Sequence, residues 1–560
     1  MDALNGAGER GRKANPSAAA AEGKLMKSKA IVVASSLCSF LSWAVFAPTA
    51  GAHGDLRKLN HVIIVMQENH SFDNYFGALP YVPGGPYHGP RHREEEEEKE
   101  GDGKGCSKHD HSCVDGLTCR VDSLGNFSCE NSNLDDDGSI VHAFHDARYC
   151  TGPDLDHSWS GSHIEANFNH PAETILSSPN DGFVLRNDST SQGQPDNSPE
   201  SPTGDDTMGF YTQADLPFYY TLAQTFAIDD RYFCSVIGQT FPNRSYALAA
   251  TSFGHLTTAE LLPPFGGYKP ITGTFFDLLD QHGVSWTDYF SDLPTAFIFR
   301  QSPNAKPAST FLADAAAGTL PQVSFVDPNF GIFSTELEND EHPPTDIRKG
   351  EKFVSDVVNA VRNSPNWKDS IIFITYDEHG GFYDHVAPAR APQGGAVNPD
   401  GINPGQCADL SNPPASEQPG GGANCGVSQM EALAICPKFT STGPYPANCP
   451  NFDQLGFRVP FIAVSPFSKP HYVSHTVGDH TSMVALIEKR FMRSNKDREE
   501  EDDRDNPPHP SLTARDANAD PLEDMFDFSG APSMNTPVPT APGDSPDDPG
   551  CPFVAPGQNG

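Results

Sequence analysis

The stretch that decides the fold is Ile371-Ile-Phe-Ile-Thr-Tyr-Asp-Glu-His-Gly-Gly-Phe-Tyr-Asp-His385. Residues 371–375 are uninterrupted β-formers, which is typical of a strand buried on both faces of a sheet. Asp377, Glu378 and His379 follow, and two glycines let the backbone turn. Open α/β sheets build their sites where parallel strands end, and carboxylates with an imidazole are metal ligands. The stretch predicts an α/β fold with a metal-assisted hydrolase site; the alternative is a strand that simply ends in a polar turn.

A second predicted strand ends in the same kinds of residue. Residues 61–66 are mostly apolar and precede Glu68, Asn69 and His70. Because the carboxyl ends of parallel strands meet at one edge of a sheet, we expect these side chains to lie beside the acids of the first stretch. Asn69 also begins an Asn-His-Ser sequon, but a buried strand end is a poor place for a glycan.

A hydroxyl near a predicted helix start supplies a candidate nucleophile. Thr240 lies in the sequence GQTFPNR, just before a helix expected to begin at residue 245. Backbone N–H groups at that end of a helix stabilise developing negative charge, which suits attack on phosphorus. The alternative is that Thr240 only caps the helix, with Pro242 in its first turn.

Two histidines and an arginine complete the candidate set. His157, in DLDHSW, is either an active-site residue or a structural histidine. His342 follows two acids in a loop after a predicted strand, which makes it a candidate ligand or proton donor. Arg244 is either a phosphate clamp or the salt-bridge partner of Asp229 or Asp230.

The composition excludes some partners. The 560 residues carry a formal charge of −37, and a hydrophobic share of 37% with 49 Gly and 51 Pro indicates a core diluted by loops. The charge argues against nucleic acid, whose phosphates need clustered Lys and Arg, and against lasting attraction to an anionic membrane. A phosphate-ester substrate would therefore need local cations.

The N-terminal residues predict export. Three lysines precede an apolar run over residues 30–46, and Ala50-Gly-Ala52 has the form of a cleavage site. Residues 1–52 are therefore predicted to be a signal peptide with a charged leader, the alternative being an uncleaved anchor. No later segment could cross a bilayer, so the mature protein is expected to be secreted and to have no transmembrane anchor.

Cysteine usage agrees with export. Of twelve cysteines, two groups of four lie at 106–129 and 407–449. They lack the CxxC pairs of zinc sites and are predicted to form disulfides, whose pairing stays open. Cys234 is expected to be a buried free thiol. A sequon at Asn126 predicts a glycoprotein.

One catalytic domain is predicted over residues 53–493, because a helix expected at 350–363 leads into the opening stretch and completes a β-α-β unit. Residues 80–140 are interpreted as an acidic, cysteine-rich insertion and 386–450 as a disulfide-stapled loop excursion. Residues 494–560 are acidic and Pro-rich, and we expect them to form a mostly disordered tail.

Five motifs in order carry a family resemblance. ENHSFDNYFG, QTFPNR, NDEHPP, YDEHGGFYDHV and DHTS…IEKRF occur as in the phosphoesterase family, over roughly residues 58–492. That family comprises bacterial phosphatidylcholine-type phospholipases C, plant non-specific phospholipases C and related secreted acid phosphatases. The resemblance implies an alkaline-phosphatase-like three-layer α/β/α sandwich, a mostly parallel sheet and metal-dependent phosphoester hydrolysis. The cysteine-rich insertion does not match a known feature of the family. It could reshape the substrate entrance, so the resemblance does not settle substrate specificity.

The resemblance also implies a set of site residues. Four residues match metal ligands: Glu68, Asn69, Asp377 and Glu378. Thr240 matches the Ser/Thr nucleophile, which also contacts the metal, and His342 matches a histidine that lines the phosphate site. His157 is a weaker match, and His379 is left to orient the ligands.

Together these features predict a secreted, metal-dependent phospholipase C-type enzyme. Thr240 would attack phosphorus to give a phosphothreonine, and His342 would protonate the leaving group or orient water. The oxygen-rich ligand set favours Ca²⁺, Mg²⁺, Mn²⁺ or Fe over a structural zinc. The expected substrate is a phospholipid. The alternatives are a secreted acid phosphatase acting on small phosphomonoesters and an inactive protein that keeps the fold.

Overall fold

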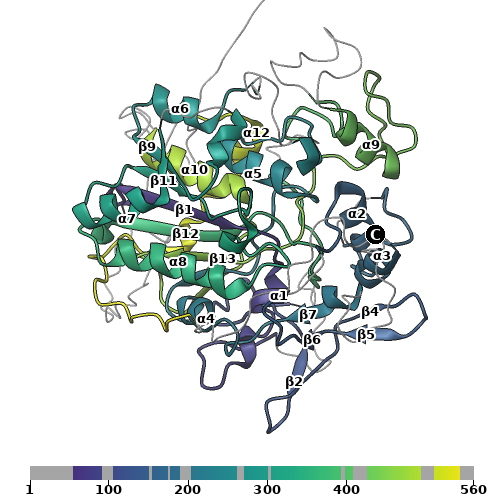
Figure 1. Cartoon of the computed structure of the whole chain (residues 1–560), viewed down its shortest axis with the longest axis horizontal. Coiled ribbons are helices and arrows are strands. Elements are labelled where there is room, and N and C mark those ends of the chain that lie inside the picture. Colours follow the sequence, from purple (N-terminus) through teal and green to yellow (C-terminus); the bar gives the residue numbers. More distant parts are fainter. Residues whose placement is uncertain are drawn as a thin grey trace, which may run out of the picture. The chain divides into compact units, whose positions relative to one another are not determined.

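An eight-stranded sheet forms the centre of the fold (Figure 1), in the order β10-β9-β11-β1-β12-β13-β8-β14. β1 (His61–Gln67) and β12 (Ser370–Tyr376) are parallel neighbours, paired from His61 with Ser370 to Gln67 with Tyr376. β13 (Phe461–Val464) runs antiparallel to both of its neighbours, and the other pairs are parallel. The remaining strands are β8 (Ala227–Asp229), β9 (Trp286–Phe290), β10 (Ala305–Pro307), β11 (Val323–Val326) and β14 (Tyr472–Ser474). The predicted α/β fold with a mostly parallel sheet is confirmed.

The computed structural model describes part of the chain. It covers residues 55–90, 105–150, 154–173, 177–189, 204–260, 270, 272–299, 304–392, 398–407, 425–492 and 510–542. The predicted signal peptide at 1–52 lies outside these residues. Among the residues that it covers, no helix combines the length and the apolar composition needed to cross a bilayer.

Helices pack around the sheet in two groups. α8 (Ile347–Arg362) begins where the Asp346 side chain accepts a hydrogen bond from Arg348 N, and it packs on β12 and on α7 (Ala308–Ala317). In the second group, α5 (Thr240–Ala249) packs on α10 (His480–Phe491) and α6 (Phe275–Gln281). The other α-helices described here are α1 (Phe72–Phe76), α2 (Trp159–Ala166), α3 (Phe183–Ser189), α4 (Pro217–Ala223), α9 (Gly426–Ile435) and α12 (Ala514–Asn518).

The cysteine-rich insertion folds into short hairpins. β2 (Cys119–Val121) pairs with β3 (Phe127–Cys129), and β4 (Ser132–Leu134) pairs with β5 (Ile140–His142). The structure resolves the pairings that the sequence left open: Cys106–Cys113, Cys119–Cys129, Cys407–Cys425 and Cys436–Cys449. Cys234 is buried and free, as predicted.

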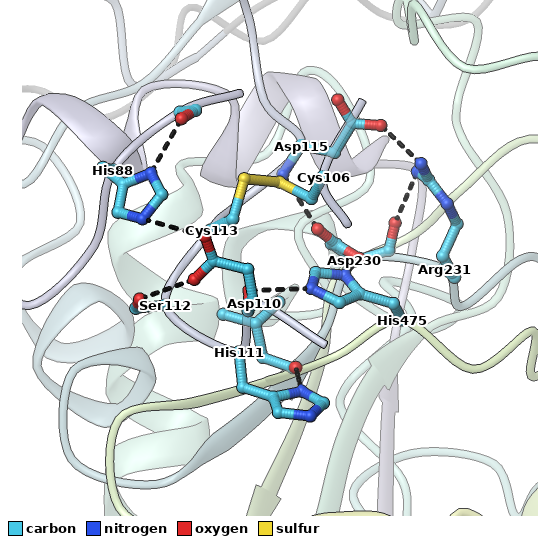
Figure 2. Close-up of a disulfide and its surroundings, with 12 residues drawn as sticks. His88, Cys106, Asp110, His111, Ser112, Cys113, Asp115, Asp230, Arg231 and His475 are labelled. Atoms are coloured by element: carbon cyan, nitrogen blue, oxygen red, sulfur yellow. Dashed lines mark hydrogen bonds and ion pairs between the residues drawn. A yellow bond between two sulfur atoms is a disulfide. The ribbon is translucent and has the colours of Figure 1, made fainter. Parts of the chain in front are cut away.

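The Cys106–Cys113 loop covers the edge of the sheet (Figure 2). Val473 N, in edge strand β14, donates to His111 O at 2.9 Å, and His111 Nδ1 donates back to Val473 O at 2.9 Å. His475 Nδ1 donates to Asp230 Oδ1 at 2.7 Å. The insertion therefore satisfies backbone groups that an edge strand would otherwise expose.

Two of the segments expected to lack structure are partly ordered. Within the predicted tail at 494–560, residues 510–542 fold onto the domain, with Met525 and Phe526 in the core. Arg515 is fully buried and donates to Asp400 at 3.1 Å and Asp479 at 3.3 Å. The prediction of disorder is wrong for residues 510–542. It rested on the acidic composition of the tail, which gives little weight to a few buried apolar and basic residues. The loop excursion at 386–450 likewise contains helix α9.

Candidate functional site

The carboxyl ends of β1 and β12 bring the predicted ligands to one edge of the sheet. Asn69 N donates to Asp377 Oδ1 at 3.2 Å, and Asp377 N donates to Gln67 O at 3.0 Å. Asn69 has a φ of 62°, in the left-handed region, where asparagine is tolerated better than most residues. The two strand ends are therefore joined directly, as the sequence pattern required.

The two glycines after the acids allow close backbone approach. Gly380 has a φ of +63°, and a Cβ there would lie 2.2 Å from the Asn69 carbonyl oxygen. A Cβ on Gly381, at φ +74°, would lie 2.5 Å from Leu155 Cβ. Since neither position has room for a side chain, the glycines hold Asn69 and the segment leading to His157 against the end of β12.

Arg244 lies between the two strand ends. Its Nη2 is 3.1 Å from Glu68 Oε1, and its Nε donates to Asp377 Oδ2 at 3.2 Å. Its position on α5, four residues after Thr240, directs it to this edge. The predicted alternative of a salt bridge to Asp229 or Asp230 is wrong, because the guanidinium pairs with the buried carboxylates of Glu68 and Asp377.

Thr240 is the first residue of α5. The N-cap is Gln239, so the alternative that Thr240 caps the helix is wrong. Asn243 fixes the preceding turn by donating from Nδ2 to Gly238 O at 2.8 Å. Residues four apart share a face of a helix, so Thr240 lies at the helix N-terminus on the face that carries Arg244 to the ligands.

The two predicted histidines lie close together, and one of them contacts Glu378. His157 is buried, with Nε2 3.7 Å from Glu378 Oε1 and Nδ1 3.5 Å from Asp154 Oδ1. His342 Nε2 lies 3.9 Å from Asp154 Oδ2, and the two imidazole rings are 6.2 Å apart. Asp154 thus links His157 to His342. This cluster is connected to the sheet edge through the contact between His157 and Glu378.

The electrostatics of the edge are dominated by carboxylates. Burial lowers the pKa of His342, but Asp154, Glu68 and Asp340 outweigh it and raise that pKa to about 10. Burial raises the pKa of Asp340, and the neighbouring Glu68 raises it further. Burial is the larger cause of this shift, and the negative charge of Glu68 adds to it.

The ligand set fits a hard divalent cation. Both side-chain polar atoms of Asn69 and the Oε1 atom of Glu378 are buried and make no hydrogen bond. Buried polar groups without a partner are costly, and an ion would supply one. Carboxylate and amide oxygens are the donors that such ions prefer, so Glu68, Asn69, Asp377 and Glu378 would hold it. The crowded negative charge favours the same occupant.

Four further residues at this edge were not predicted. Asp327 directly follows β11, the strand next to β1. After Asp377 and Glu68, Asp327 and Asp340 also raise the pKa of Arg244, against the effect of burial. His480 Nε2 donates to Asp377 O at 2.8 Å, and Glu165 lies 2.9 Å from His379 Nε2. The strand-end rule that found Glu68 also applies to Asp327. The other three residues, Glu165 on α2, His480 on α10 and Asp340 in the NDEHPP loop, come to this edge only when these segments pack together.

Glu341, beside the site, makes stability depend on pH. Its buried carboxylate accepts hydrogen bonds from Gln67 and three hydroxyls, those of Tyr75, Tyr219 and Tyr376. Burial raises the pKa of Glu341 from 4.5 to about 7, although those bonds lower it. Between these values the folded protein binds a proton that the unfolded chain has released. The free energy of unfolding therefore falls as pH rises through this range.

Glu341→Gln should remove this titration. From pH 4.5 to 7.5 the free energy of unfolding of the variant should rise relative to wild type by on the order of 3 kcal/mol, at about 1.4 kcal/mol per pKa unit. Denaturant unfolding at four pH values measures it, with the exposed Glu336→Gln as matched control. Parallel pH profiles for Glu341→Gln and wild type would show that Glu341 does not titrate in this window.

Comparisons with known proteins identify the family of this chain. The phosphoesterase family profile matches residues 59–492. Non-specific phospholipase C6 of Arabidopsis thaliana is 32% identical over 345 residues, 59% of this chain and 55% of that protein, so the match spans about half of the relative. Non-specific phospholipase C1 of the same plant is 28% identical over 496 residues, covering 85% and 72% of the two chains. Phospholipase C B of Mycobacterium tuberculosis is 29% identical over 524 residues, covering 86% and 80%.

The family model covers most of the chain, including each of the strand ends and loops that form the edge described above. The expected resemblance is therefore confirmed. The chain belongs to the phosphoesterase family and is a hydrolase acting on phosphoric ester bonds.

Proposed function

We propose that this protein is a secreted, metal-dependent phospholipase C-type enzyme with Thr240 as its nucleophile. The observation that carries the proposal is the sheet edge where the neighbouring strands β1 and β12 end next to Glu68, Asn69, Asp377 and Glu378, and where Arg244 of α5 contacts Glu68 and Asp377. Thr240 is the first residue of the same helix. The names of the relatives, which are phospholipases C, support a phospholipid substrate.

Each residue has a role in the proposed reaction. Thr240 Oγ1 forms a bond to phosphorus while the bond from phosphorus to the diacylglycerol oxygen breaks, and the helix N-terminus stabilises the added charge. A bound divalent cation would polarise the phosphoryl oxygen and lower the pKa of the hydroxyl. The Thr240 hydroxyl loses its proton to solvent as the new bond forms, and His342 gives its own proton to the leaving oxygen. When water hydrolyses the phosphothreonine, His342 accepts a proton from that water, and the departing Thr240 Oγ1 regains a proton from solvent.

The supporting residues have narrower roles. His157 holds Glu378 in place through the 3.7 Å contact. Glu378 and Asp154 raise the pKa of His157 against the effect of burial, which favours its cationic form. The Arg244 guanidinium, which contacts Glu68 and Asp377, is the candidate phosphate clamp. His379 lies 3.3 Å from Glu378 Oε2, whereas His157 contacts the other carboxylate oxygen, Oε1. We therefore assign His379 the role of orienting Glu378.

The rest of the proposal concerns architecture and location. We assign the fold to the alkaline-phosphatase-like three-layer type, which the two helix groups around the sheet support. Four described disulfides fit an extracellular protein. Asn126 is exposed on the β2–β3 turn and is a suitable glycan acceptor, whereas Asn69 is buried.

A substrate panel on the mature protein tests the function. Phosphatidylcholine should be cleaved to phosphocholine and diacylglycerol, and its kcat/KM should exceed that of an aryl phosphate monoester by at least about tenfold. The reverse order would replace the proposal with the secreted acid phosphatase. Turnover of neither substrate, by protein loaded with each candidate divalent ion, would favour an inactive member of the family.

A further inference from the structure

The loop after β11 carries exposed apolar side chains beside the catalytic edge. Ile332, Phe333 and Leu337 are 48%, 77% and 65% exposed. Single exposed apolar residues are ordinary on protein surfaces, but three within six positions of one loop mark an interaction surface. The segment from 332 to 337 is called the apolar tip.

The stem of this loop is attached to the catalytic edge. Asn339 N donates to Asn329 O at 3.0 Å, and Asn329 N donates to Asn339 Oδ1 at 2.6 Å, which closes the loop. Gln67 Nε2, one residue before Glu68, donates to Asn339 O at 3.0 Å. The loop therefore begins and ends next to a predicted metal ligand.

The conformation of the loop is held by specific contacts. The Arg244 guanidinium carbon lies 4.9 Å from the centre of the Phe330 ring. Asp292 accepts hydrogen bonds from Phe330 N at 3.2 Å and from Ile332 N at 3.1 Å. The stem and one side of the loop are fixed in this way, and Phe333 and Leu337 are exposed to solvent.

We propose that the apolar tip inserts into the surface of a zwitterionic phospholipid layer and brings headgroups to the catalytic edge. The inference rests on the proposed phospholipase C function. Glu336 and Glu338 border the apolar side chains, and the whole chain carries a charge of −37. This charge repels anionic lipid, whereas the outward-facing cation of a choline headgroup complements the two glutamates.

The test separates lipid docking from catalysis. The variant Ile332→Ser/Phe333→Ser/Leu337→Ser should lower the partition coefficient onto phosphatidylcholine vesicles at least tenfold, measured by co-sedimentation. The ratio of its turnover on these vesicles to its turnover on monomeric short-chain phosphatidylcholine should fall at least tenfold. Phosphatidylglycerol vesicles should bind the wild type more weakly than phosphatidylcholine vesicles do. Unfolding curves of the variant and the wild type confirm that both are folded.

A matched control replaces three exposed apolar residues outside the loop, Leu312, Met534 and Val538, with serine. It should bind vesicles as the wild type does. The proposal is overturned if the loop variant binds and turns over vesicles like wild type, if the control loses as much, or if anionic vesicles bind more tightly. If the wild type cleaves phosphatidylcholine neither in vesicles nor as short-chain monomers, the proposed function fails. The vesicle-binding measurements still decide whether the apolar tip binds the lipid surface.

Discussion

Thr240→Ala should reduce turnover by about 10³-fold or more while leaving the fold intact. The hydroxyl is the only part of the side chain that can form the bond to phosphorus, and loss of a covalent nucleophile typically removes most of an enzyme's rate acceleration. Thr240 is half-buried and Gln239 holds the N-cap, so we expect the melting temperature to change by only about 2 °C. Steady-state kinetics and thermal unfolding of the purified variant measure both effects.

Two variants sharpen this prediction. Thr240→Ser keeps a hydroxyl and should retain measurable turnover. Thr258→Ala is the matched control, because Thr258 Oγ1 accepts from Phe241 N at 3.1 Å at the same helix start but takes no part in the proposed reaction. Acid quenching of wild type during turnover should trap a phosphorylated peptide containing residue 240. Full activity in Thr240→Ala would remove the nucleophile from the proposed mechanism.

The core of the site was predictable because it follows from strand ends. Apolar runs that stop at Glu68 and at Asp377 specify two buried parallel strands, and parallel strands bring their carboxyl ends together. The structure places these strands side by side in full register. This part of the site can therefore be predicted from short stretches of sequence, because each strand is directly followed by its polar residues.

Other features depended on contacts between distant segments. The sequence offers Arg244 either a phosphate or the nearby acids Asp229 and Asp230, but the guanidinium contacts Asp377, 133 positions away. Glu165 and His480 join the site only through the packing of α2 and α10. Glu165 has no local pattern that predicts it, and the DHTS motif marks His480 without giving it a role at the site. The tail was misjudged for the same reason: Arg515 is stabilised by Asp400 and Asp479, whose positions composition does not reveal.

Removal of the divalent cation should abolish activity, and Glu378→Gln should reproduce most of that loss. Glu378 Oε1 is buried and makes no hydrogen bond, while Oε2 accepts from Gly380 N at 2.7 Å. An amide of the same shape keeps the packing but removes the charge that the cation needs. We expect turnover to fall about 100-fold or more, together with the metal content of the purified protein.

The matched control is Glu351→Gln, a change of an equally buried glutamate on α8 that accepts from Phe218 N and Tyr219 N. It should cost stability without changing metal content, because its carboxylate lies outside the edge. Exhaustive chelation followed by metal analysis and readdition of Ca²⁺, Mg²⁺, Mn²⁺ or Fe²⁺ identifies the ion that restores turnover. Unchanged activity after chelation, with metal shown to be absent, would mean that the crowded carboxylates of this edge are balanced by Arg244 and the histidines alone.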